Sequence, residues 1–281
     1  AGESPLMHQL ELQHYPQTGH LFGDLPLSLV VKGVIAGNSQ GMIWVDQPEQ
    51  PTVAVLWDGT HSFYLAGVPD NPGLNQNLRE FITDHLLPTS LPFNNGVFKL
   101  YYPSDTWKAI IPELFHSSTL IQRERCLYSV DPASSDSTED SVNDTNGYST
   151  RLIDQTLLAN TNLQHLDDLT GEINSCWTAM DRFLEYGFGF CMVHEDTIAG
   201  WCTAEYVSPG ICGIGIETVE AYQQQGIATR LARSMIAYCR QQNIQPHWDA
   251  WATNRPSIRV AEKAGLQKVL DYSIYFSYGK G

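Results

Sequence analysis

A polar, glycine-containing loop between an apolar run and a long amphipathic run is the segment best suited to chemistry. The apolar run, Ile211–Thr218, is predicted to be a strand, and a helix is predicted from Gly226 to Gln242. Ile227, Leu231 and Met235 recur at the spacing of one helix face. The start of a helix presents unpaired backbone N–H groups and the positive end of the helix dipole, so such a loop can bind a pyrophosphate. An ordinary turn with glycine at positive φ is the alternative interpretation.

Two motifs in this region carry a resemblance to a known family. Residues 223–228 read Gln-Gln-Gln-Gly-Ile-Ala, which resembles the Gln/Arg-x-x-Gly-x-Gly/Ala signature of the GNAT superfamily of N-acetyltransferases. From Asn254 the chain reads Asn-Arg-Pro-Ser-Ile-Arg-Val-Ala-Glu-Lys-Ala-Gly-Leu, which resembles the Asn-x-x-Ser/Ala…Glu-Lys-x-Gly-Phe ending of that family. The motifs stand in the family's order around a strand predicted at Pro246–Ala252. The chain is therefore similar to a bacterial GNAT subfamily that carries an additional N-terminal domain.

The resemblance implies acetyl-CoA as co-substrate and assigns contacts to it. Backbone groups of Ile216 and Thr218 would pair with the pantetheine arm as another strand does. Asn254 would hydrogen-bond the same arm or bridge the splayed strands, with Ser257 nearby. The pyrophosphate would be held by backbone N–H groups of the loop and first helical turn: Gln224, Gln225, Gly226, Ile227, Ala228 and Thr229.

The family's usual reaction is direct attack of a primary amine on the thioester, in a complex with both substrates. Because an alkylammonium group must lose a proton before it attacks, a base is needed. Glu217 and Asp249 lie on strands expected to line the cleft and are the predicted bases; for each, an exposed carboxylate or a salt-bridge partner is the alternative. Many relatives place a tyrosine proton donor where this chain has Ala261. Protonation of the departing thiolate would then need Tyr275, Tyr272 or solvent.

The predicted elements divide the chain into an N-terminal α/β domain (7–130), an acidic linker (131–147) and a GNAT-like domain (148–281). The predicted fold class is α/β (α+β), a mixed sheet flanked by helices, preceded by a smaller α/β domain. Both halves share an order of elements, which suggests the hypothesis of a tandem duplication with a degenerate GNAT-like first half. In that half, strands are predicted at Leu27–Ile35, Gly41–Val45, Thr52–Leu56, Ser62–Leu65, Val97–Tyr102 and Leu120–Val130, and helices at Asn75–Leu87 and Asp105–Phe115.

In the second half, the residues from Thr150 to Leu158 are predicted to be a strand, and two helical stretches follow. The remaining predicted elements are strands at Gly189–His194, Ile198–Val207, Ile211–Thr218 and Pro246–Ala252, a helix at Pro256–Ala264, and one or two strands within Leu266–Tyr278.

Composition limits the partners. The 281 residues include 16 Lys and Arg against 31 Asp and Glu, a formal charge of −15. Such a field repels nucleic acid and anionic lipid and attracts cationic small molecules or basic peptides. The apolar runs are too short to cross a bilayer, which predicts a cytoplasmic protein without a membrane partner. The six cysteines are predicted to be buried, reduced thiols, and neither Cys nor His has metal-ligand spacing, so no metal is expected.

Three hypotheses stay open for the function. The first is an N-acetyltransferase acting on a small-molecule amine, with the N-terminal domain completing the acceptor pocket or forming a homodimer. The second is a non-catalytic acyl-CoA sensor, which Ala261 favours. The third is a peptide or protein N-acetyltransferase, which would need an open acidic groove between the domains. Substituting Glu217 and Asp249 while following thiol release distinguishes an enzyme from a sensor, because a sensor has no turnover to lose.

Overall fold

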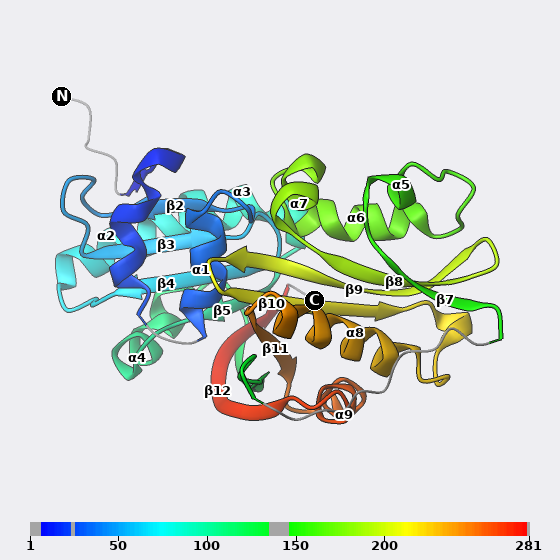
Figure 1. Cartoon of the computed structure of the whole chain (residues 1–281). Helices are drawn as coiled ribbons and strands as arrows, with labels where there is room; N and C mark the ends of the chain where they lie inside the picture. Colours follow the sequence, from blue (N-terminus) through cyan, green and yellow to red (C-terminus); the bar gives the residue numbers. More distant parts are fainter. Residues whose placement is uncertain (1–6, 24–25, 135–145, 280–281) are drawn as a thin grey trace. The chain divides into compact units, whose positions relative to one another are not determined.

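The computed structural model describes residues 7–23, 26–134 and 146–279, which form two compact units (Figure 1). Unit 1 contains the described residues up to Arg123 together with those from Ser273 onward, and unit 2 contains Glu124–Tyr272. This division differs from the boundary predicted at 131–147, because two long strands each belong partly to one unit and partly to the other. Of the predicted linker, residues 135–145 lie outside the described residues.

The sheet of unit 1 has the strand order β1-β2-β3-β4-β5-β12. Among the residues that the structure describes, only the β4–β5 pair of this sheet is parallel, and the end of β12 pairs with β5. The strands are β1 (His8–Gln9), β2 (Met42–Val45), β3 (Val53–Trp57), β4 (Ser62–Gly67), β5 (Val97–Tyr101) and β12 (Gln267–Tyr278). The helices are η1 (Leu12–Leu21), α1 (Leu27–Ile35), α2 (Pro72–Phe81), the π-helical η2 (Ile82–Leu86), α3 (Leu87–Asn94) and α4 (Asp105–Leu114).

The prediction of a strand at Leu27–Ile35 is wrong, because this segment is the helix α1. A short run of apolar, β-branched residues cannot be assigned from its pattern alone, since buried helices and buried strands share that composition. Here Leu29, Val31 and Val34 are all buried, and burial outweighs the strand preference of valine. The helix predicted at Asn75–Leu87 is confirmed but is longer: Asn71 caps α2, and the helical path continues through η2 and α3.

The sheet of unit 2 has the order β6-β11-β10-β9-β8-β7. Its only parallel pair among the described residues is β10–β11. The strands are β6 (Leu120–Ser129), β7 (Tyr148–Leu152), β8 (Gly189–His194), β9 (Thr197–Ser208), β10 (Ile211–Thr218) and β11 (Gln245–Trp251). The helices are α5 (Gln155–Leu158), α6 (Leu166–Cys176), α7 (Met180–Tyr186), η3 (Glu220–Tyr222), α8 (Ile227–Gln241) and α9 (Arg255–Lys263).

One strand prediction in unit 2 needs correction. The segment from Thr150 to Leu158 is not one strand, since β7 ends at Leu152 and α5 follows. The carboxylate of Asp154 accepts the backbone N–H of Leu157 at 2.8 Å, which starts the helix. The strands predicted at β8 and β10, and the long helix α8, are confirmed.

The two units repeat one topology. In each, three antiparallel strands are followed by a helix and a fourth strand parallel to the third: β2-β3-β4 then β5, and β8-β9-β10 then β11. The fourth strand then has an antiparallel neighbour from the other half of the sequence, β12 beside β5 and β6 beside β11. The predicted mixed α/β fold with a repeated order is thereby confirmed.

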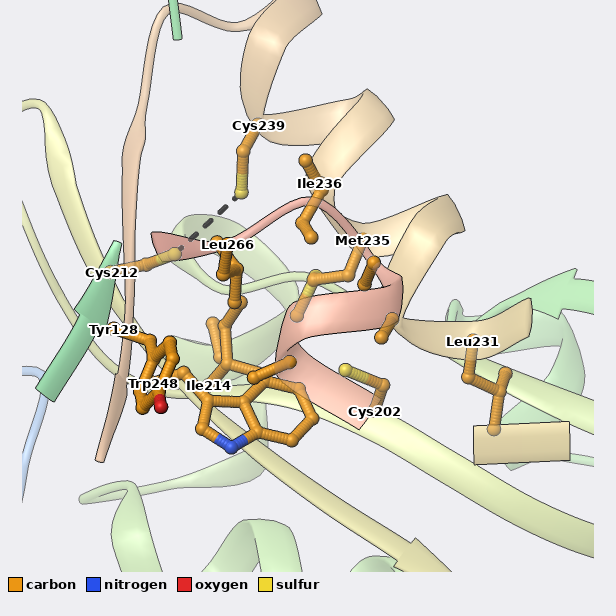
Figure 2. Close-up of a cluster of buried hydrophobic side chains, with 14 of the residues drawn as sticks. Tyr128, Cys202, Cys212, Ile214, Leu231, Met235, Ile236, Cys239, Trp248 and Leu266 are labelled. Atoms are coloured by element: carbon orange, nitrogen blue, oxygen red, sulfur yellow. Dashed lines mark hydrogen bonds between the residues drawn. The ribbon is translucent and has the colours of Figure 1, made fainter. Parts of the chain in front are cut away.

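Two cores cover the faces of the unit 2 sheet. One packs α8 and α9 on the sheet around Trp248 and Met235 (Figure 2), and the other packs α6 and α7 around Trp177. All six cysteines are thiols rather than disulfides, and five of them are buried, as predicted, whereas Cys176 is partly exposed. Cys212 of β10 and Cys239 of α8 lie with their sulfur atoms 3.7 Å apart. No helix of the described residues is long and apolar enough to span a membrane.

Candidate functional site

The parallel strands β10 and β11 separate partway along their length. Among the described residues their ladder comprises three pairs, of which Gly213 with His247 is the last. Beyond this pair, β10 continues to Thr218 beside β9, and β11 continues to Trp251 beside β6. A β-bulge between Gly213 and Ile214 marks the point of separation. The facing edges therefore offer backbone groups to an extended ligand, and Ile216 and Thr218 lie on this edge.

The N-terminus of α8 follows the open edge of β10. Gly226 is the N-cap residue, with φ 78°, and Gln224 also has a positive φ of 61°. A Cβ atom added at Gly226 would meet nothing within 4 Å. Because glycine has no capping side chain and the space above it is open, the first-turn N–H groups are accessible to an anion. The loop therefore fits a pyrophosphate, and its binding by Gln224 to Thr229 stays a prediction.

Two glutamine side chains of this loop are hydrogen-bonded to other parts of unit 2. Gln223 donates its amide to the carbonyl of Thr218 at 3.3 Å, and the amide oxygen of Gln225 accepts the Tyr148 hydroxyl at 3.0 Å. These contacts connect the loop to β10 and β7. The backbone N–H groups at Gly226, and not the side chains of Gln223 and Gln225, are consequently the groups available to a ligand there.

Asn254 and Ser257, both predicted to contact the cofactor, have partners within the protein. The side chain of Asn254 caps α9 by accepting the backbone N–H of Ser257 at 3.3 Å. The hydroxyl oxygen of Ser257 accepts the indole N–H of Trp248 at 3.0 Å. These contacts fix the start of α9 against β11.

Acidic side chains gather on the sheet face that α6 covers. Donor atoms of Glu172, Cys176 and Glu205 all lie within 4.8 Å of one another, so this group is one place where a cation could be held. Burial raises the pKa of the Glu172 carboxyl, and the charge of Glu217 on β10 raises it further. The Glu205 carboxylate lies over the bare backbone of Gly215, where an added Cβ would come within 2.1 Å of it. Next to the open edge of β10, the sheet is thus strongly negative.

Asp249 lies on β11, two residues beyond the last residue paired with β10, and its carboxylate is engaged by β6 and β12 on the other side of β11. Its Oδ1 atom forms an ion pair with Arg125 and lies 2.5 Å from both Nε and Nη2 of the guanidinium. Its Oδ2 atom accepts a hydrogen bond from the hydroxyl of Tyr272. Tyr275 lies elsewhere: it is buried in the core of unit 1 and donates its hydroxyl to the carbonyl of Lys108 at 2.9 Å. The structure thus brings Tyr272, and not Tyr275, to Asp249. Sequence reasoning missed Arg125, because it lies 124 residues before Asp249 in the chain and no local pattern indicates that the two side chains pair.

The corresponding helix start in unit 1 has N–H groups that are already bonded. The side chain of Asn71 caps α2 by accepting the N–H groups of Gly73 and Leu74, at 3.0 and 3.3 Å. The indole of Trp107 donates to the carbonyl of Gly67, at the end of β4, across 2.8 Å. A pocket of about 930 Å³ beside the start of α2 is lined by Asp46 and Asp70, among others. Their charges, and the satisfied donors, disfavour a phosphate group here.

Comparisons with known proteins agree with this architecture. An uncharacterized N-acetyltransferase of Bacillus subtilis (strain 168), YdfB, is 22% identical over 272 residues, which cover 97% of this chain and 99% of the relative. A GCN5-related N-acetyltransferase-like protein from Streptococcus suis 89/1591 has a similar structure (TM-score 0.67, 21% identity, 94% and 98% of the two chains). A tandem GNAT protein from the clavulanic acid biosynthesis pathway is also similar (TM-score 0.61, 12% identity, 98% and 99% covered). The family model for GNAT acetyltransferase, whose members use acetyl-CoA, matches residues 19–275. The chain therefore belongs to the GNAT acetyltransferase family and is an N-acetyltransferase.

Proposed function

We propose that this protein transfers the acetyl group of acetyl-CoA to a primary amine of a cationic small molecule. One observation carries the proposal: the open edge of β10 leads directly to the accessible N-terminus of α8. That arrangement suits a ligand with an extended amide-containing arm and a pyrophosphate at its end. In the proposal, backbone N–H groups from Gln224 to Thr229 bind the pyrophosphate, and Ile216 and Thr218 pair with the arm.

The acceptor amine would approach from the face covered by α6. Glu172, Glu205 and Glu217 give that face a negative charge, which attracts an ammonium group. Glu217 is exposed on the open segment of β10, and we assign it the role of removing the ammonium proton. Holding the amine and the thioester on two sides of one opening supplies most of the rate advantage through orientation.

Calorimetric titration with acetyl-CoA tests the cofactor site. In the Gly226→Asp variant a carboxylate occupies the phosphate position, and we expect the affinity to fall about tenfold or more, a loss of roughly 1.4 kcal/mol or more. The Gly210→Asp variant is the matched control. Gly210 also has a positive φ (76°) and nothing within 4 Å of an added Cβ, but it lies in the turn between β9 and β10. Equal affinity of both variants and the parent would contradict the proposed pyrophosphate site.

Amine-dependent thiol release then tests the reaction. Diamines and polyamines are expected to support turnover, and Glu217→Gln is expected to reduce it by about 100-fold or more, the usual contribution of a positioned base. Acetyl-CoA binding without turnover on any amine would favour the sensor hypothesis. Turnover on basic peptides alone would favour the peptide or protein N-acetyltransferase. The homodimer and the cytoplasmic location stay predictions.

A further inference from the structure

A β-bulge in β9 brings two consecutive side chains of unit 2 to one face of the sheet. Tyr206 pairs with Gly213, and Ala204 pairs with Ile214, so that Glu205 is the extra residue of β9. Consecutive residues of a regular strand point to opposite faces, whereas a bulge interrupts this alternation and redirects a side chain. Glu205 and Tyr206 can therefore lie on the same face.

Two glycines of β10 show which face this is. A Cβ atom added at Gly213 would overlap the ring of Tyr206, and one added at Gly215 would overlap the carboxylate of Glu205. The ring and the carboxylate thus lie directly over the bare backbone of β10. Ile214, between the two glycines, packs into the core beneath α8 and α9. Since neighbours in a strand alternate, both glycines face the opposite side, which α6 covers.

These side chains lie beside the opening between β10 and β11. Gly213 is the last β10 residue in the described ladder with β11, so the Tyr206 ring lies at the closed end of the opening. Gly215 and Glu217 follow on the open segment and share the same face. They are about 7 Å apart along the strand, since each residue adds about 3.3 Å. Glu205 and Tyr206 are partly exposed and Glu217 is exposed, so a ligand can reach all three.

An aromatic ring beside a carboxylate is suited to a cation. The face of the ring attracts positive charge, and the carboxylate accepts the N–H groups of an ammonium ion. Glu172 of α6 adds a second carboxylate, whose oxygen lies within 4.8 Å of that of Glu205. Such surroundings favour the charged form of an amine. The nitrogen that attacks a thioester must instead lose its proton, so the group held here is better suited to be a second amine of the acceptor.

We propose that Tyr206 and Glu205 determine the specificity of acetyl transfer by holding a second ammonium group of the acceptor, so that the substrate is a short-chain diamine. This inference rests on the proposed function, in which Glu217 takes the proton of the reacting amine. The amino group at Glu205 keeps its proton, and the amino group beside Glu217 is acetylated. The spacing of Gly215 and Glu217 along the open strand suits the two ends of one short chain. The product is the monoacetylated diamine.

The test compares two amines that differ only in the second amino group. Diaminobutane carries an amino group at each end of its chain, and butylamine carries one. The parent should prefer diaminobutane in kcat/KM by about tenfold or more, the effect of one hydrogen bond between charged groups. Glu205→Gln should bring the preference close to one. Tyr206→Leu should lower it by about fivefold, through loss of the cation–π contact, whereas Tyr206→Phe keeps the ring and should retain it. The KM for acetyl-CoA should stay within about twofold in each variant.

Two further variants separate the position of the charge from its presence. Gly215→Ala keeps the carboxylate of Glu205 but places a methyl group where that carboxylate lies, so it should also lower the preference for the diamine. Glu185→Gln removes one negative charge from the exposed face of α7 and should leave the preference unchanged. An equal effect of Glu185→Gln and Glu205→Gln would show that only the net charge matters, which contradicts the inference.

The outcomes distinguish this inference from the proposed function. Equal kcat/KM for both amines in the parent would overturn the inference while leaving acetyl transfer intact. So would a fall in kcat by the same factor on both amines in Glu205→Gln, because Glu205 would then act in the chemistry rather than in recognition. A parent protein that binds acetyl-CoA and acetylates no amine would overturn the proposed function and this inference with it. Should Tyr206→Leu not fold, the nearly isosteric Glu205→Gln decides the question alone.

Discussion

The indole N–H of Trp248 donates to the hydroxyl oxygen of Ser257 at 3.0 Å, so that β11 is joined to the first turn of α9. Trp248 is only 2% exposed, so its N–H has no access to bulk water. We expect Ser257→Ala to lower the free energy of unfolding by about 1–3 kcal/mol, the cost of an unsatisfied buried donor. Urea denaturation measures this loss.

Ser234→Ala is the control for removing a hydroxyl, since the Ser234 hydroxyl donates to a backbone carbonyl of its own helix, that of Arg230, at 3.2 Å. It should change stability by less than about 0.5 kcal/mol. If Ser257→Ala instead kept its stability and lost acetyl-CoA affinity, Ser257 would be a cofactor contact, as the sequence predicts.

One molecule of acetyl-CoA should bind per chain, although the two units share a topology. The start of α8 is accessible at Gly226, whereas the start of α2 is capped by Asn71 and flanked by Asp70. Calorimetry should therefore give a stoichiometry near one, and Gly226→Asp should weaken that single binding event by about tenfold or more. A second binding event that survives this substitution would show that unit 1 also takes the ligand.

Cys176 should react first with iodoacetamide in the folded protein at pH 8. Alkylation requires an accessible thiolate. Burial raises the pKa of Cys191 to about 12, and it raises the pKa of Cys202 well above the usual range. Cys176 is the one cysteine that is not buried. Peptide mass spectrometry after brief labelling identifies the modified site, and early labelling of Cys202 would contradict the structure.

Glu172 should make the folded protein less stable as the pH rises. Its pKa is raised on folding by burial and then by the charge of Glu217. A carboxyl group whose pKa is higher in the folded than in the unfolded protein contributes its full stabilisation of the folded state below the unfolded pKa. This contribution is lost as the pH rises through the folded pKa. Glu172→Gln should therefore raise the Tm at pH 7 by more than it does at pH 4. Thermal unfolding at both values measures the difference, and Glu185→Gln, on the exposed face of α7, is the control. An equal change at both pH values would contradict the raised pKa.

Local patterns predicted much of the fold. The meander β2-β3-β4, the strands β8 and β10 and the helix α8 all follow from alternation or helical spacing within a few residues of their observed limits. The loop at Gly226 was found for the same reason, because strand, glycine and helix are contiguous in the sequence. Such features depend on neighbours in the chain.

Features that depend on distant partners were missed. The apolar run of α1 has no periodicity that separates helix from strand, and only its burial in unit 1 decides. Tyr272 and Tyr275 are three residues apart in one strand, and only the structure shows that the first contacts Asp249 and the second Lys108. Arg125 reaches Asp249 because β6 pairs with β11, and a pairing over 124 residues leaves no local signal.

The strand β6 of the first half of the sequence pairs with β11, and the strand β12 of the second half pairs with β5. The two halves of the sequence therefore depend on each other to fold. A polypeptide of residues 148–281 would lack β6, and with it both the outer neighbour of β11 and the guanidinium at Asp249. Cleavage between residues 131 and 147 would likewise produce two fragments, each carrying the strand that completes the other's sheet. Two genes encoding those fragments would have to be expressed together, and their products would assemble as an intertwined heterodimer rather than as independent domains.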